Sequence, residues 1–180
     1  MKQTSKVLLS VALLGTAITG VAHADQLDDI KKAGKITVAV FDSNPPFGYV
    51  DQQSKNLTGY DIDFANEIAA KLGVKLELKT TNPANRIPLL VSSKVDTVVA
   101  AFTITDERAQ QVDFTTPYFV TGQQFLVKKG KFPKLDDLKN AKIGAVKGTT
   151  GEQQLHTSFP QAKVLSFDEI AVAFAAQRSG

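Results

Sequence analysis

The sequence contains no cysteine and no tryptophan, and it has only two histidines in 180 residues. The absence of cysteine excludes disulfides, thiolate metal ligands and a cysteine nucleophile. A catalytic triad built on histidine has little support, because His156 is the only histidine beyond residue 24 and lies in a polar stretch of predicted helix. The loop 148–151 lacks the Lys-Ser/Thr pair of a phosphate-binding loop. No cofactor and no metal is implied.

An excess of charge of one sign is also lacking, since 21 Lys and Arg residues stand against 18 Asp and Glu residues. Two of the basic residues, Lys2 and Lys6, belong to an N-terminal segment that we expect to be removed, which leaves the rest of the chain nearly neutral. No basic block follows, so the pI near 9.0 does not indicate nucleic-acid binding. With 43% hydrophobic residues, the chain has the composition of a globular protein rather than a disordered one.

The first 24 residues have the parts of a secretory signal peptide. Two lysines precede an apolar run over 7–21, and Ala22-His23-Ala24 places small residues at the two positions that a signal peptidase reads. We therefore expect cleavage after Ala24 and export to the periplasm. The apolar core over 7–18 is too short to cross a bilayer and no second apolar run follows, so the exported chain is not expected to be membrane-embedded. The alternative is a buried N-terminal helix.

After this segment, hydrophobic periodicity predicts a unit of alternating strands and helices. The β-branched run 35–40 predicts a strand, preceded by a short helix over 27–32. We expect Asp61 to cap a helix whose apolar residues recur at helical spacing and which ends at Gly73. The unit continues with a strand over 74–78, a short helix through Leu90 and a buried strand over 95–101.

A second unit repeats this order with a strand over 141–146, a helix over 152–158, a strand over 162–167 and a helix over 169–177 capped by Asp168. In the first unit the corresponding helix leads into a turn and a buried strand, whereas here the sequence ends after the turn. The last helix is left with an apolar face that no strand covers, formed by Ile170, Val172, Ala173 and Phe174. We expect the chain to be an N-terminal fragment of a longer protein, or the product of a premature stop.

Residues 101–108 follow the predicted buried strand, at the sheet edge where open α/β proteins hold their ligands. Thr105 is placed to cap a short helix, with Arg108 three residues further on. A guanidinium group and the nearby Thr103 hydroxyl would make a receptor for a carboxylate. The spacing equally allows Thr105 to be only a helix cap and Arg108 a surface cation.

Four segments in the same order resemble the family 3 solute-binding proteins, the polar amino-acid receptors of ABC importers. They are Gly59–Ala65, the run Phe102–Arg108 that follows Val95-Asp96, Val112–Tyr118 and Gly148–Glu152. The resemblance implies an α/β fold of the periplasmic binding protein type (type II), with two lobes joined by a hinge. Residues 25–122 would form the first lobe, and 123–180 the hinge crossing and an incomplete second lobe. We expect the crossing near 122–129, with a strand over 123–127.

The resemblance also implies a role for five residues. Arg108 would bind the α-carboxylate of an amino acid bidentately, helped by the Thr103 hydroxyl, while the Ala101 carbonyl would accept a hydrogen bond from the α-ammonium. From the second lobe, N–H and hydroxyl groups around Thr149 and Thr150 would close on the carboxylate. In the family, an aspartate from beyond the missing strand usually completes the ammonium site.

Ligand specificity would rest on side chains of the first lobe, for which we predict Asp42, Asn44, Phe47, Tyr60 and the segment 85–90. In aspartate- and glutamate-binding relatives, an arginine at the position of Arg86 reaches the distal carboxylate, so we favour an acidic amino acid. Against this preference, the carboxylate of Asp42 would repel an acidic ligand. Similar Arg-Ile segments also occur in receptors for other polar amino acids. For Phe47 and Tyr60 the sequence favours the alternative that they are core residues.

Two other classes of protein share features with this sequence. Periplasmic cyclohexadienyl or arogenate dehydratases resemble these receptors and could use the same Arg108 clamp, although Asp42 is the only further acid/base candidate. A sensor domain of a receptor kinase would need a transmembrane segment and a kinase, which do not follow. We therefore expect no enzyme but a binding protein, working as a monomer with a small amino acid and the permease of an ABC transporter as its partners, and with no nucleic acid.

Overall fold

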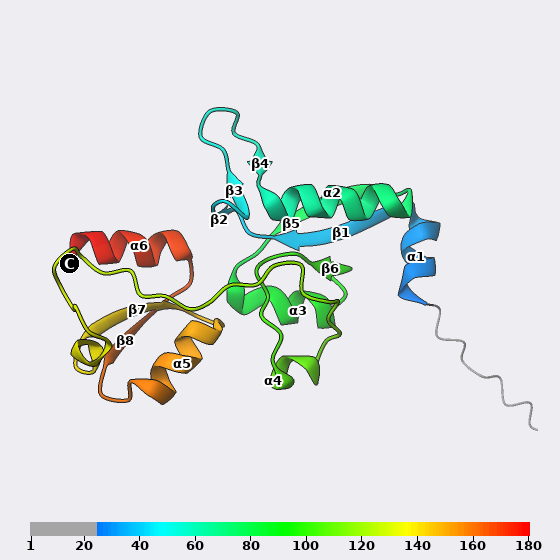
Figure 1. The fold of residues 1–180 in the computed structure, drawn as a ribbon. Coiled ribbons are helices and arrows are strands. Elements are labelled where there is room, and N and C mark those ends of the chain that lie inside the picture. Colours follow the sequence, from blue (N-terminus) through cyan, green and yellow to red (C-terminus); the bar gives the residue numbers. More distant parts are fainter. Residues whose placement is uncertain (1–24) are drawn as a thin grey trace, which may run out of the picture.

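The computed structural model describes residues 25–180 and arranges them as a mixed α/β protein with two groups of elements (Figure 1). The predicted export signal and its cleavage after Ala24 lie outside the described residues. Within 25–180, no helix combines the length and the apolar character needed to cross a membrane.

A parallel sheet of three strands forms the centre of the first group, in the order β5 (Lys75–Thr80), β1 (Lys35–Val40) and β6 (Thr97–Val98). The predicted strand over 35–40 is confirmed, and it is the middle strand. Val38, Ala39 and Val40 are fully buried, as expected for a parallel strand covered on both faces. The strands therefore end together at one edge of the sheet, which is the edge that carries the candidate site.

Two helices, α1 (Gln26–Ala33) and α2 (Tyr60–Leu72), pack on this sheet. Ile30 of α1 and the face Ile62, Ala65 and Ala69 of α2 share one core with strand β1. Gly73 ends α2 in the left-handed conformation, as predicted, and its N–H donates to carbonyl groups of the last turn. Helical periodicity therefore predicted the packed face of α2 correctly.

The start of α2 differs from the prediction. The N-cap is Gly59, and Asp61 lies inside the first turn with no exposed surface, so the predicted cap at Asp61 is wrong. A small antiparallel sheet precedes the helix, with β2 (Ser43–Asn44), β3 (Gly48–Val50) and β4 (Leu57–Thr58). The turn between β2 and β3 supplies the capping acceptors, because the backbone N–H groups of Tyr60 and Asp61 donate to the carbonyls of Pro46 and Phe47 at 3.0 and 2.8 Å.

The predicted buried strand over 95–101 forms a ladder only at β6, although Val95, Val99 and Ala100 are buried as expected. Ala101 has φ +44°, which turns the chain out of the sheet. Before this strand, a 3-10 helix η1 (Pro83–Asn85) leads directly into α3 (Arg86–Val91), and after it comes α4 (Asp106–Ala109). These short elements surround the carboxyl end of the sheet.

The second group contains a parallel pair of strands, β7 (Lys142–Val146) and β8 (Lys163–Phe167), between helices α5 (Thr150–Ser158) and α6 (Ile170–Ser179) (Figure 1). The short 3-10 helix η2 (Leu135–Leu138) precedes β7. Leu138, Ile143, Leu155 and Phe159 belong to a core separate from that of the first group. This second core supports the division into two lobes. The boundary between them at residue 122 stays a prediction.

Three expectations for the second lobe have different outcomes. No residue of α6 is buried, and Val172 and Phe174 are 52% and 49% exposed, so the prediction of an uncovered apolar face is confirmed. Asp168 does not cap α6, because its carboxylate pairs with Lys147 at 2.8 Å and Glu169 takes the N-cap position. The predicted strand over 123–127 is wrong, since this stretch is exposed and pairs with no strand within the described part of the chain.

We predict that Gly59→Ala lowers the free energy of unfolding by at least about 2 kcal/mol. Gly59 has φ +121°, and a Cβ there would overlap the Phe47 carbonyl and lie 2.7 Å from the Pro46 oxygen. The control is Gly73→Ala at φ +68°, where nothing lies within 4 Å and only the conformational cost of about 1 kcal/mol applies. Urea unfolding measures both, and equal losses would contradict the role given to the Phe47 turn.

Candidate functional site

Arg108 lies in the short helix α4, and its side chain is only 6% exposed. The predicted cap is confirmed, because the Thr105 hydroxyl accepts a hydrogen bond from the Arg108 N–H at 3.3 Å. This turn directs the guanidinium back to the strand end, where it donates to the Thr103 carbonyl at 2.7 Å and to the Gly148 carbonyl at 2.9 Å. Arg108 is therefore not a surface cation. Its three other N–H groups have no hydrogen-bond acceptor among residues 25–180.

Arg86 is the first residue of α3 and is buried more deeply, with 3% of its surface exposed. Its guanidinium donates to four carbonyls, those of Pro83 at 3.0 Å, Ala100 at 3.1 Å, Ala101 at 2.9 Å and Gly148 at 3.0 Å. Burial and, to a smaller extent, the charge of Arg108 together lower the pKa of Arg86 to about 9. Four of its five N–H groups are thus engaged by backbone, which leaves one for any ligand.

Phe102 holds the two guanidinium groups against one ring. The guanidinium carbon of Arg86 lies 4.3 Å from the ring centroid and that of Arg108 lies 4.8 Å from it. The negative face of an aromatic ring attracts both cations and offsets part of their mutual repulsion. Phe102 was missed by the sequence analysis. Its position between Ala101 and Thr103 was a usable signal, although nothing local shows that Arg86 reaches the same ring.

The loop between β7 and α5 brings the second lobe to this pair of arginines. The Gly148 carbonyl accepts from both, and the Gly148 N–H donates to Glu152 of α5 at 3.0 Å. Gly148 has φ +73°, and a Cβ there would lie 2.8 Å from the Ala84 Cα in η1. The two lobes therefore approach each other closely at a glycine, which the sequence analysis treated only as part of a loop.

Thr149 and Thr150 lie next to this carbonyl at the N-terminus of α5, in line with the predicted second-lobe side of the site. The Thr149 hydroxyl caps the helix, accepting from the Glu152 N–H at 3.1 Å and donating to the Val146 carbonyl at 2.7 Å. The Thr150 hydroxyl accepts from the Gln123 amide at 2.9 Å. The Thr149 hydroxyl is thus used both as donor and as acceptor, whereas the Thr150 hydroxyl keeps its own O–H. The donors that α5 can offer to an anion are therefore this O–H and the backbone N–H groups of the first turn.

The other predicted residues are distributed around this centre. The Ala101 carbonyl already accepts from Arg86, whereas the Thr103 hydroxyl has no partner among the described residues. Phe47, Ala101 and Thr103 line a groove of about 690 Å³ beside β6, together with Tyr118 and Phe119. The two arginines and the two threonines of α5 do not line this groove. The predicted site residues therefore do not all border one cavity.

Phe47 packs edge-on against Phe119, with ring centroids 4.9 Å apart. This contact is compatible with Phe47 as a pocket residue and with Phe47 as a core residue. Tyr60 is 45% exposed, so its interpretation as a core residue is wrong. Asp42 and Asn44 are half-buried around the start of β2, near which α6 contacts the first lobe. Neither side chain of this pair bonds to another described residue.

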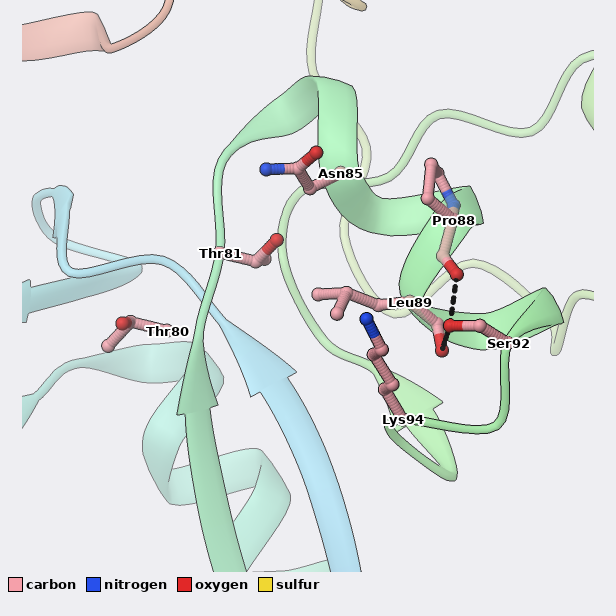
Figure 2. Close-up of a pocket in the computed structure, with 7 residues that line it drawn as sticks. All are labelled: Thr80, Thr81, Asn85, Pro88, Leu89, Ser92 and Lys94. Carbon is pink, nitrogen blue, oxygen red and sulfur yellow. Dashed lines mark hydrogen bonds between the residues drawn. The ribbon is translucent and has the colours of Figure 1, made fainter.

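The segment 85–90 contributes to a smaller pocket between the end of β5 and α3 (Figure 2). This pocket has a volume of about 290 Å³ and is bordered by Asn85, Pro88 and Leu89 of that segment, with Thr80, Thr81, Ser92 and Lys94. The Ser92 hydroxyl donates to the Pro88 carbonyl at 2.6 Å, which fixes one wall. Arg86 and Arg108 do not border it, so this pocket is separate from the arginine pair.

A buried carboxyl group, that of Asp61, forms a hydrogen bond with Tyr118. Tyr118 donates its hydroxyl to Asp61 Oδ1 at 3.1 Å, and its ring stacks on Phe64 at 4.9 Å. Asp61 Oδ2 is buried without a partner among the described residues. Burial raises the pKa of Asp61 to about 6, against a smaller lowering by the Tyr118 hydroxyl. This contact ties α2 to the last residues of the first lobe, just before the chain crosses to the second.

Comparison with known proteins places this geometry in a family. Residues 36–162 match the bacterial extracellular solute-binding proteins, family 3. The chain belongs to this family. The family and the two-lobed type II binding-protein fold predicted from the sequence are thus confirmed.

Two relatives illustrate how the family uses this fold. The chain is 40% identical over 161 residues to the ABC transporter glutamine-binding protein GlnH of Bacillus subtilis (strain 168), covering 87% of this chain and 59% of that protein. It is 34% identical over 172 residues to the L-cystine-binding protein TcyJ of Escherichia coli (strain K12), covering 93% and 64%. The chain therefore spans less than two thirds of either relative.

Solved structures of amino-acid-binding proteins have the same fold. The ancestral amino acid-binding protein AncCDT-1, a precursor of cyclohexadienyl dehydratase, superposes with a TM-score of 0.82 at 38% identity, over 87% of this chain and 70% of that one. An amino acid ABC transporter substrate-binding protein from Streptococcus pneumoniae bound to L-arginine gives a TM-score of 0.83 at 33% identity, over 87% and 68%. Proteins of this fold are thus named for several polar amino acids.

We predict that Arg86→Met lowers the free energy of unfolding by roughly 3 kcal/mol, because it removes four hydrogen bonds to carbonyls, of which only that of Gly148 keeps a second donor in Arg108. Arg108→Met should cost less, since that guanidinium serves two carbonyls. Chemical denaturation of both variants makes the comparison. An Arg86→Met protein as stable as the parent would show that Arg86 is not a structural residue.

A second prediction concerns pH. The pKa of Asp61 is about 6 in the folded protein and near 3.8 when exposed, so between these values the folded state binds the extra proton and stability falls as pH rises. Below about pH 4 the group contributes nothing, and above about pH 6 its ionisation costs most. Asp61→Asn should remove this decline, while Asp63→Asn, exposed in the same first turn, should preserve it. Urea titrations between these pH values decide.

Proposed function

We propose that this protein is a periplasmic receptor that captures a polar amino acid between its lobes for delivery to an ABC importer. The observation that carries the proposal is the Arg108 guanidinium, which is almost fully buried at the end of the sheet and retains three N–H groups without an acceptor among the described residues. A buried cation with unused donors is a strong receptor for a carboxylate. Relatives named as amino-acid-binding proteins of ABC transporters support the same function.

The carboxylate would be shared by the two lobes. Arg108 and the unpartnered Thr103 hydroxyl offer donors from the first lobe, and the N-terminus of α5 offers backbone N–H groups from the second. The α-ammonium needs an acceptor as well, because a zwitterion that leaves water requires a partner for each charge. The Ala101 carbonyl keeps one lone pair for it, beside its bond to Arg86.

For the side chain of the ligand we propose glutamate or aspartate, a choice that rests on the two adjacent positive charges of Arg86 and Arg108. The engagement of Arg86 by four carbonyls favours a second candidate, glutamine, because the single N–H left on Arg86 cannot form a bidentate pair with a distal carboxylate. The relatives in turn are named for glutamine and for cystine. Comparing the affinity of the protein for glutamate with its affinity for glutamine distinguishes the two candidates.

The enzyme alternative has no observation in its favour. Asp42 was its only acid/base candidate, and the relatives are named as binding proteins. The neighbour AncCDT-1 is itself described as an amino acid-binding protein. Incubation with prephenate and arogenate tests this directly, and turnover of either substrate would overturn the receptor proposal.

Calorimetry with glutamate, aspartate, glutamine, cystine and arginine tests the proposal. We expect one of them to bind, and Arg108→Met to weaken its binding by roughly 100-fold or more, since it removes the partner of a buried carboxylate. Arg178→Met is the charge-matched control, because Arg178 lies over Phe174 on α6, and it should bind like the parent protein. Equal binding by Arg108→Met and the parent would refute the assignment of Arg108.

A further inference from the structure

One backbone carbonyl of the second lobe lies between the two cations of the first. The Gly148 oxygen is 3.0 Å from Arg86 Nη2 and 2.9 Å from Arg108 Nη2. Hydrogen bonds from a charged donor are roughly twice as strong as neutral ones, and these two lie in a region where both arginines are more than nine-tenths buried. This oxygen occupies the same kind of position that one oxygen of a bound carboxylate would take.

We propose that the Gly148 carbonyl is an interlobe latch, an internal substitute for the ligand carboxylate that holds the lobes together on the paired guanidinium groups when no amino acid is bound. An entering carboxylate would then compete with this carbonyl for the Arg108 N–H groups. The latch itself is independent of the ligand, whereas its role in controlling ligand entry rests on the proposed receptor function.

The residue at position 148 has to be glycine for this contact. Its φ of +73° is unfavourable for any side chain, and an added Cβ would meet the Ala84 Cα at 2.8 Å and the Pro83 oxygen at 3.1 Å. These atoms belong to the backbone of η1, which Arg86 fixes through its bond to the Pro83 carbonyl. A side chain at 148 would therefore push the second lobe away from the arginines.

Few other contacts hold the lobes together. Helix α6 touches β2 of the first lobe, yet none of its residues is buried. The bond between Gln123 and Thr150 joins α5 to the crossing segment rather than to the body of the first lobe. The Arg86, Arg108 and Gly148 cluster, which is partly buried, is thus the one side-chain hydrogen-bonded contact that the described residues make between the bodies of the two lobes.

The absence of cysteine allows spin labels at chosen sites only. Labels at Glu67→Cys on α2 and Gln154→Cys on α5, both exposed, report the distance between the lobes by double electron–electron resonance. Without added amino acid, the parent should give one narrow distribution at short distance. Gly148→Ala should give a longer and broader distribution. Gly34→Ala, at φ +67° with nothing within 4 Å, is the matched control and should match the parent.

Arg108→Met provides a second test with Gly148 intact and should also lengthen the distance. Circular dichroism shows whether Gly148→Ala folds. If it does not fold, the distance measured in Arg108→Met tests the latch instead. An unchanged distance in Gly148→Ala or, in that event, in Arg108→Met overturns the latch. Because no amino acid is present in these samples, this failure is distinct from failure of the receptor function, which appears as absence of binding in calorimetry.

Discussion

Two positive charges held side by side in a buried place are the constraint on which this site depends. Burial lowers the pKa of both Arg86 and Arg108, and the charge of Arg108 also lowers that of Arg86. Six hydrogen bonds to backbone carbonyls and the face of Phe102 offset the cost of this burial. The carbonyls come from the end of β6, from η1 and from the second lobe, so the same interaction positions three parts of the chain.

The sequence predicted the regular elements well and their beginnings less well. Periodicity located α2 and β7, because their buried residues recur at the spacing of their own backbone, and β-branched content located β1. The start of α2 was misplaced because its capping acceptors are the carbonyls of Pro46 and Phe47, more than ten residues earlier. Asp61 has the right chemistry for a cap, but the turn that supplies these carbonyls buries it instead. A local rule cannot anticipate an acceptor that arrives through tertiary structure.

The same limit separates what was found in the site from what was missed. Arg108 and Thr105 were predicted because their relation is local, since Arg108 is the third residue after Thr105. Phe102 and Gly148 were missed because their importance depends on Arg86, which lies 62 residues before Gly148 in the chain. For Arg86 the sequence supplied the residue but not its surroundings, since only the fold shows that Pro83, Ala100 and Ala101 turn their carbonyls to it.

These surroundings bear on specificity. An arginine whose donors are fixed by backbone contributes charge and position, but it has little geometric freedom to read one side chain rather than another. Under the proposed function, discrimination between polar amino acids would then come from side chains with unused hydrogen-bonding capacity or exposed surface, such as Thr103, Asp42 and Phe47. This division of labour is consistent with a family in which similar chains are named for glutamine, cystine and arginine. The cationic centre would serve the carboxylate common to all amino acids, while the residues around it would set the preference among them.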